Sequence, residues 1–92
     1  MEVGSEDFKR ELELYLLLQH NAKVIYVLTH TTVEDRCVTY RSRCEVWRLG
    51  LLASGKPSAT VWDSQNSAAA EMLEWLRINK SWYLKRERAP VT

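Results

Sequence analysis

The stretch KVIYVLTHTTVEDRCVTYRSRCEVWRLGLL, residues 23–52, decides the fold because β-branched and aromatic residues dominate it. We predict a strand over residues 23–30, a polar turn over Thr31–Arg36, and a long strand or a pair of strands over residues 37–52. The segment Ala53-Ser54-Gly55-Lys56-Pro57 is predicted to form a hairpin turn, and Ala59–Trp62 a short last strand.

Two helical segments flank this stretch. Residues 5–20 contain no Gly or Pro, and Ser5 or Asp7 can cap their first turn. Residues 65–79 follow two capping candidates, Asp63 and Ser64, and carry an apolar stripe at helical spacing. The order α-β-β-β-α predicts an α+β fold, a two-layer sandwich in which an antiparallel three-stranded sheet packs against two helices. This domain is expected to cover residues 1–80, and residues 81–92 form an aromatic and basic C-terminal tail.

Composition limits the function classes. The 92 residues carry 13 basic and 12 acidic side chains, a net charge of +1, whereas a compact nucleic-acid binder has a clear basic excess. The first ten residues lack the pattern of a secretory signal, and the longest apolar run, Leu14 to Leu18, is too short to span a membrane. We therefore expect a cytoplasmic or nuclear protein with reduced cysteines at positions 37 and 44.

The sequence contains no motif that indicates catalysis. A nucleophile elbow, a phosphate-binding loop, a zinc-protease motif and a dinucleotide-binding turn are all missing from the chain. His20 and His30 are isolated, and the carboxylates are spaced as on a solvated surface. We expect a protein that is not an enzyme and that uses no metal and no cofactor.

Three short stretches carry a resemblance to a known family. They are Pro57-Ser58-Ala59-Thr60-Val61, residues 72–78 (MLEWLRI), and residues 44–52 (CEVWRLGLL). With the order α-β-β-β-α, the hairpin Gly55-Lys56 and the alanine-rich second helix, the chain resembles a double-stranded RNA-binding domain. It is most similar to the degenerate third copy in Dicer-partner proteins such as TRBP, PACT and Loquacious.

The chain departs from that family at the RNA-binding positions. Ordinary members carry Gly-Pro-x-His in the first strand connection and Lys-Lys-x-x-x-Lys at the start of the second helix, which contact the RNA backbone. Here the connection is TTVEDR (31–36), and the helix start QNSAA (65–69) has no lysine. The interval from Val61 to Leu73 is also about two helical turns shorter than in the Dicer-partner copies when the helix ends are matched. Matching the helix starts instead places Ala68, Met72, Leu73 and Leu76 in the core.

We therefore expect a protein–protein interaction module that does not bind double-stranded RNA strongly. The resemblance implies a role in RNA silencing (RNA interference), with Dicer as the larger partner. It also implies a homodimer through the last strand, with the interface residues Ser58, Ala59, Thr60, Val61 and Trp62. Partner contact is implied at Leu49, Val61 and Ala69, to which the apolar pattern adds Leu14, Leu17 and Leu18.

Three alternatives stay open. The tail residues Trp82, Tyr83 and Leu84 could fold back over the surplus apolar side chains. RNA could bind to the tail through Lys85, Arg86 and Arg88, with Trp82 and Tyr83 as stacking groups. The chain could also be a small viral or phage inhibitor protein, for which the sequence has no positive marker.

Overall fold

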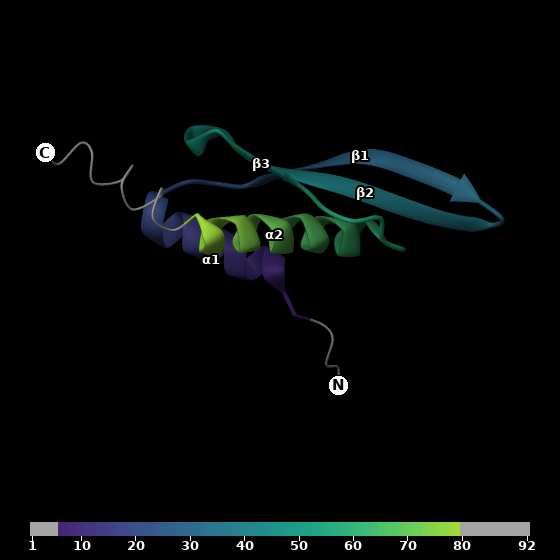
Figure 1. Cartoon of the computed structure of the whole chain (residues 1–92), viewed down its shortest axis with the longest axis horizontal. Coiled ribbons are helices and arrows are strands. Elements are labelled where there is room, and N and C mark those ends of the chain that lie inside the picture. Colours follow the sequence, from purple (N-terminus) through teal and green to yellow (C-terminus); the bar gives the residue numbers. More distant parts are fainter. Residues whose placement is uncertain (1–5, 80–92) are drawn as a thin grey trace, which may run out of the picture.

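A long hairpin of two strands, β1 (Ile25–Glu34) and β2 (Cys37–Val46), forms most of the sheet in the computed structural model, which describes residues 6–79 (Figure 1). The antiparallel register runs from Ile25 opposite Glu45 to Glu34 opposite Cys37, with a bulge between Leu28 and His30. The turn consists of Asp35 and Arg36, with φ values of 48° and 67°. Positive φ at both central residues matches the right-handed twist of a two-residue hairpin.

The predicted turn over Thr31–Arg36 is therefore wrong in its extent. β1 continues through Thr31, Thr32 and Val33, and only Asp35 and Arg36 leave the strand pair. These three residues are β-branched and favour the extended backbone once a partner strand lies opposite them. The hairpin consequently extends past the start of the second helix, and its outer half is exposed (Figure 1).

The third strand is β3 (Leu51–Ser54), which pairs with β2 from Val46 opposite Leu51 to Arg43 opposite Ser54. A short 3-10 turn, η1 (Trp47–Leu49), and Gly50 at φ 67° connect β2 to β3. The strand order is β1-β2-β3, and both pairings are antiparallel as predicted. Of the two readings of residues 37–52, the pair of strands is confirmed.

The predicted strand over Ala59–Trp62 is wrong. Ser58 makes one isolated bridge to Tyr40, with N–H to O distances of 2.7 and 2.8 Å, and the chain then bends at Ala59 and Thr60. The side chain of Thr60 accepts a hydrogen bond of 3.0 Å from the backbone N–H of Asp63. This N-cap starts helix α2 (Val61–Ile78) at Val61 rather than at residue 65, so Val61 and Trp62 are helical.

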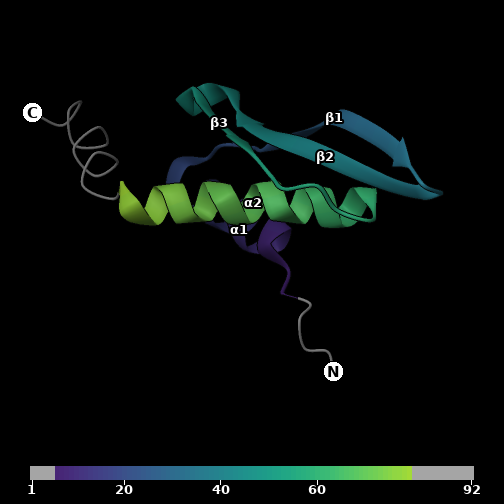
Figure 2. The same ribbon diagram turned by 45° about the vertical axis from the view of Figure 1, so that its right-hand side comes forward.

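Helices α1 (Phe8–His20) and α2 lie side by side and cover one face of the sheet (Figures 1 and 2). The order α-β-β-β-α and the α+β fold are as predicted. The core consists of buried side chains from both helices, from β2 and β3, and from the connection that follows α1: Leu12, Leu16, Ala22, Cys44, Val46, Leu51, Ala68, Ala69, Met72 and Leu76. Leucine, methionine and alanine at helical spacing explain why each helix buries one stripe: α2 packs on the sheet, and α1 packs mainly against α2.

Candidate interaction surface

The positions at which the resembled family binds RNA carry few cations in this structure. The turn between β1 and β2 contains Asp35 and Arg36 and follows Glu34. The first turn of α2 contains Asp63, and the only basic residue of this helix, Arg77, lies in its last turn. Arg77 forms an ion pair of 2.5 Å with Glu74. These elements therefore present no row of lysines to a phosphate backbone.

The one lysine of α1, Lys9, makes its contacts within the fold. The Lys9 Nζ donates a hydrogen bond of 2.6 Å to Gln65 Oε1 and lies 5.0 Å from the ring centre of Tyr26 and 5.7 Å from that of Trp62. The backbone N–H of Lys9 also donates to Asn66 Oδ1 at 3.0 Å. These contacts join the N-terminal ends of the two helices to β1, so the charge of Lys9 has a structural role.

The five residues predicted for the homodimer interface do not form a continuous edge. Ser58 pairs with β2, Thr60 caps α2, and Val61 and Trp62 lie in the first turn of that helix. Val61 and Trp62 are 38% and 45% exposed, so their side chains still reach the surface. Backbone pairing through this segment is excluded by its helical and bent conformation.

The residues predicted to contact a partner differ in how exposed they are. Ala69 is fully buried in the core, so its place in a partner interface is wrong. Leu49 is partly buried against the core. The three leucines of the α1 outer face, Leu14, Leu17 and Leu18, are exposed as predicted, at 45%, 53% and 75%. Lys85, Arg86, Arg88 and the aromatic residues of the tail lie outside the described residues.

The edge of the sheet that can pair with another chain is the outer side of β3. β3 is the last strand in the order β1-β2-β3, and no described residue pairs with its outer side. The backbone N–H of Gly55 donates to the carbonyl of Ser42, so the alternation of antiparallel bonds turns the N–H groups of Leu52 and Ser54 outward. The strand sequence LLAS contains no charge and no proline, which are the usual protections of an edge.

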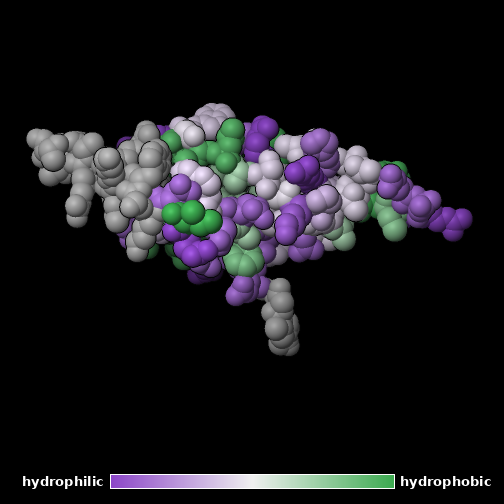
Figure 3. Space-filling model, viewed as in Figure 1, coloured by the Kyte–Doolittle hydropathy of each residue, from purple (hydrophilic) through white to green (hydrophobic). Residues whose placement is uncertain are grey.

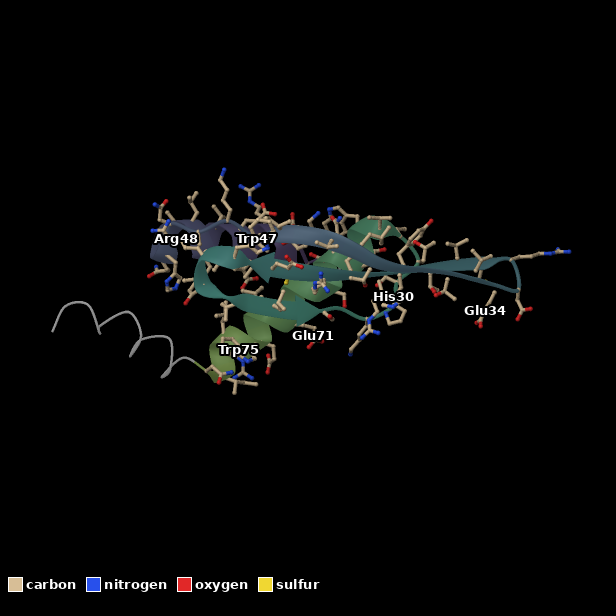
Figure 4. All side chains as sticks on the ribbon, turned by 90° about the horizontal axis from the view of Figure 1, so that it is seen from above. His30, Glu34, Trp47, Arg48, Glu71 and Trp75 are labelled. Carbon is tan, nitrogen blue, oxygen red and sulfur yellow. The ribbon has the colours of Figure 1, made fainter. Side chains whose placement is uncertain are left out.

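Exposed apolar side chains lie on this edge strand and in the last turn of α2. Leu52 of β3 is 64% exposed, and Ile78 of α2 is 66% exposed. Figure 3 shows hydrophobic side chains over β3 and over the C-terminal end of α2. Figure 4 shows Trp75 on the part of α2 that emerges past β3. The edge therefore combines unpaired backbone groups with a hydrophobic border.

The sheet face opposite the helices carries a second exposed cluster, here named the outer patch and formed by Ile25, Trp47 and Leu52 around Glu45. Glu45 lies opposite both Ile25 and Leu52 in the strand register. Its Oε1 accepts a hydrogen bond of 2.6 Å from Trp47 Nε1, and its Oε2 accepts one of 2.7 Å from Arg43 Nε. Both hydrogen bonds lower the pKa of the Glu45 carboxyl, and the bond from Trp47 has the larger effect.

Sequence reasoning missed both the β3 edge and the outer patch. The predicted strand over Ala59–Trp62 displaced the edge to the wrong segment. The alternation Arg43-x-Glu45-x-Trp47 was the available signal for the patch, because residues two apart on a strand share a face. β2 ends at Val46, and Trp47 is the first residue of the 3-10 turn η1.

The described residues contain little that suggests chemistry. No three His, Cys, Asp or Glu side chains between residues 6 and 79 lie close enough together to hold a metal ion. A hollow of about 240 Å³ between the helices is lined by Tyr15, Leu73, Leu76 and Arg77, without a nucleophile beside a base. No helix in this part of the chain is both long and apolar enough to cross a membrane.

Both cysteines have free thiols. Cys37 begins β2 at the exposed end of the hairpin, and Cys44 is buried in the core. They lie seven positions apart on one strand, about 23 Å at about 3.3 Å per residue, which is far beyond the reach of a disulfide. Burial raises the pKa of the Cys44 thiol to about 12, so this thiol stays protonated.

Comparison with known proteins adds no identification: no family model matches the chain, and no curated protein matches its sequence.

Proposed function

We propose that this chain is a protein–protein interaction module built on a fold like that of a double-stranded RNA-binding domain. Its core does not bind double-stranded RNA strongly. It pairs with a second copy and binds a larger protein partner. The resemblance to Dicer-partner proteins suggests Dicer as that partner, in RNA silencing. The observation that carries the proposal is the uncharged outer edge of β3 beside exposed apolar side chains.

The β3 edge supports self-association for a physical reason. An unprotected strand edge presents unpaired N–H and C=O groups that a second strand can satisfy. Two identical edges related by a two-fold axis are self-complementary, and Leu52 of each copy would bury apolar area beside the backbone bonds. The homodimer predicted from the sequence is thus proposed again, now at Leu51–Ser54 instead of Ser58–Trp62.

The missing cations support the loss of RNA binding. Each phosphate that a protein contacts through a lysine or arginine adds affinity and salt dependence. The β1–β2 turn places Glu34 and Asp35 beside Arg36, and the first turn of α2 places Asp63 where a cation would be needed. These residues repel a phosphate backbone rather than bind it.

Light scattering coupled to size exclusion tests the edge directly. The wild-type full chain is expected to elute with the mass of two copies. Ser54→Pro removes an outward N–H and is expected to give one copy, whereas Ser54→Ala, the matched control, keeps the N–H and the dimer. A wild-type monomer, or a dimer that Ser54→Pro leaves intact, would contradict pairing through β3.

Binding to the larger partner needs its own test. Purified Dicer is passed over the immobilised full chain, and retention is expected for the wild type and for Ser54→Ala. Failure to retain Dicer would remove Dicer as the partner and would leave the β3 result unchanged.

A further inference from the structure

The outer patch is pre-organised for binding. Trp47 is 73% exposed, yet its indole N–H is held by the Glu45 carboxylate at 2.6 Å. A charge-assisted hydrogen bond of this kind restricts the side chain before a partner arrives, which lowers the entropic cost of association. Ile25 and Leu52, at 40% and 64% exposure, lie on opposite sides of Glu45 on the same face of the sheet. Figure 4 looks onto this face and shows Trp47 at its border.

The border of the outer patch carries positive charge. Arg43 pairs with Glu45 at 2.7 Å, and this pair neutralises the centre. Arg41 and Arg48 are both exposed, and neither forms an ion pair with an acidic side chain among residues 6–79. Arg41 uses its Nε for a hydrogen bond to the carbonyl of Gly55. The patch is therefore an apolar centre with two exposed arginines at its rim that no carboxylate among residues 6–79 neutralises.

The α1 outer face has the opposite character. Leu14, Leu17 and Leu18 project from the side of α1 that does not contact the sheet, since Leu12 and Leu16 occupy the buried side. The exposed charged residues of α1 and of its two flanking segments are mostly acidic: Glu6, Asp7, Glu11 and Glu13 against Arg10 and Lys23. Glu13 and Lys23 lie closest to Leu17, since these three residues line one hollow. This surface is a leucine-rich helix face whose surroundings carry an excess of carboxylates.

We propose that the outer patch of one copy binds the α1 outer face of a second copy. The apolar centres match, and the rim arginines of the first surface meet the carboxylates of the second. In this arrangement the helix of the second copy covers the outer face of the sheet, as the molecule's own helices cover the inner face.

This contact is head-to-tail because its two surfaces lie on opposite layers of the molecule (Figures 1 and 2). A head-to-tail contact leaves one unused surface of each kind at the ends, so it produces stacks of copies rather than a closed pair. The contact does not rest on backbone pairing through the β3 edge, although Leu52 borders both surfaces. Few large side chains take part, so the contact belongs to the small, weak class and should be visible at about 0.1–1 mM protein.

Complementary variants give the test. Trp47→Ser with Ile25→Thr disables the outer patch, and Leu17→Gln with Leu18→Gln disables the α1 outer face. Every protein also carries Ser54→Pro, so that pairing through β3 does not contribute to the mass. Val33→Ser is the matched control because Val33 is 67% exposed at the hairpin end, outside both surfaces.

Sedimentation equilibrium is expected to give a mass that rises with concentration for the Ser54→Pro parent and for the Val33→Ser control. Each disabled variant alone is expected to remain at the mass of one copy, with at least a tenfold loss of affinity. An equal mixture of the two disabled variants is expected to form a 1:1 complex, because each supplies the surface that the other lacks. A mixture that stays monomeric, a parent that does not associate, or variants that associate like the parent would overturn the proposal.

A single substitution at the border of the outer patch tests the same contact if the double variants fold poorly. Arg48→Glu changes an exposed charge in η1 and is expected to weaken association of the Ser54→Pro parent. Added salt should weaken the parent's association in the same direction. Association that is indifferent to both changes would contradict the charge-matched contact.

Discussion

The hydroxyl oxygens of Ser42 and Ser64 lie 2.6 Å apart, and both residues are fully buried between β2 and α2. Ser64 Oγ also donates a hydrogen bond of 2.7 Å to the carbonyl of Val61. Because the proton of Ser64 is used in that bond, Ser42 is the donor to Ser64. Two polar groups thus fix the register of the helix on the sheet in the middle of an apolar core.

Because Ser42 donates to Ser64 and Ser64 donates to Val61, alanine substitutions of the two serines are expected to lower the free energy of unfolding by different amounts. Ser64→Ala leaves the Ser42 hydroxyl buried without its acceptor and is expected to cost about 1–3 kcal/mol of unfolding free energy. Ser42→Ala leaves the Ser64 proton bonded to Val61 and is expected to cost only about 0.5–1.5 kcal/mol. Urea unfolding of both variants gives the comparison, and a larger loss for Ser42→Ala would reverse the assigned donor.

Glu45 predicts a pH dependence of stability. Its folded pKa lies below its ordinary value because Trp47 and Arg43 donate hydrogen bonds to the carboxylate. A depressed pKa means that the stabilisation is fully present above the ordinary pKa of about 4.5 and is lost as the pH falls through the folded pKa. Glu45→Gln is therefore expected to flatten the acid side of a plot of melting temperature against pH.

Glu34→Gln is the control for this experiment, because the Glu34 side chain at the hairpin end takes part in no hydrogen bond or ion pair among the described residues. It should leave the acid side of the curve unchanged. Equal curves for Glu45→Gln and the wild type would show that the Arg43–Glu45–Trp47 contacts do not persist in solution.

The sequence predicted the element order because its local signals were strong. Helical stripes around Leu12 and Met72 and the β-branched run after Lys23 indicated the two helices and the strands between them. The order α-β-β-β-α is correct, although its third strand is Leu51–Ser54 and not Ala59–Trp62. The errors arose where tertiary context overrode local pattern. Val61 and Trp62 favour a strand by residue type, but the N-cap of Thr60 commits them to α2.

The interaction surface was predicted less well than the fold. The exposed leucines of α1 were identified because one helix face exceeded what a small sheet could bury. Ala69 was misplaced because the side of a helix that meets the sheet depends on packing, which the resemblance did not determine. The β3 edge depended on knowing which strand comes last, so the error at Ala59–Trp62 carried over to the interface.

Substitution by alanine is expected to destabilise the fold more at Gly55 than at Gly50. A Cβ added to Gly55 would lie 2.5 Å from the backbone nitrogen of Ala68, and backbone atoms of α2 cannot move aside cheaply. Gly55→Ala should therefore push the β3–α2 connection away from the helix and cost about 1–3 kcal/mol or more. Gly50 has φ 67° and open space around it, so Gly50→Ala should cost only about 1 kcal/mol through backbone strain. Thermal unfolding of the two variants should rank Gly55→Ala as the less stable.

RNA binding gives the last prediction. The full chain is expected to show no binding to a 20-base-pair RNA duplex at physiological salt, because two carboxylates, Glu34 and Asp35, lie at the β1–β2 turn and the first turn of α2 contains Asp63 and no cation. Fluorescence polarisation of a labelled duplex provides the measurement, and submicromolar, salt-sensitive binding would refute the prediction. The triple variant Lys85→Ala, Arg86→Ala, Arg88→Ala then identifies the source of any binding observed. If it abolishes that binding, RNA contacts the C-terminal tail and the proposed module keeps its core function. If the binding survives, the folded core recognises the duplex without the lysines of the resembled family, and the proposal that it has lost RNA binding fails.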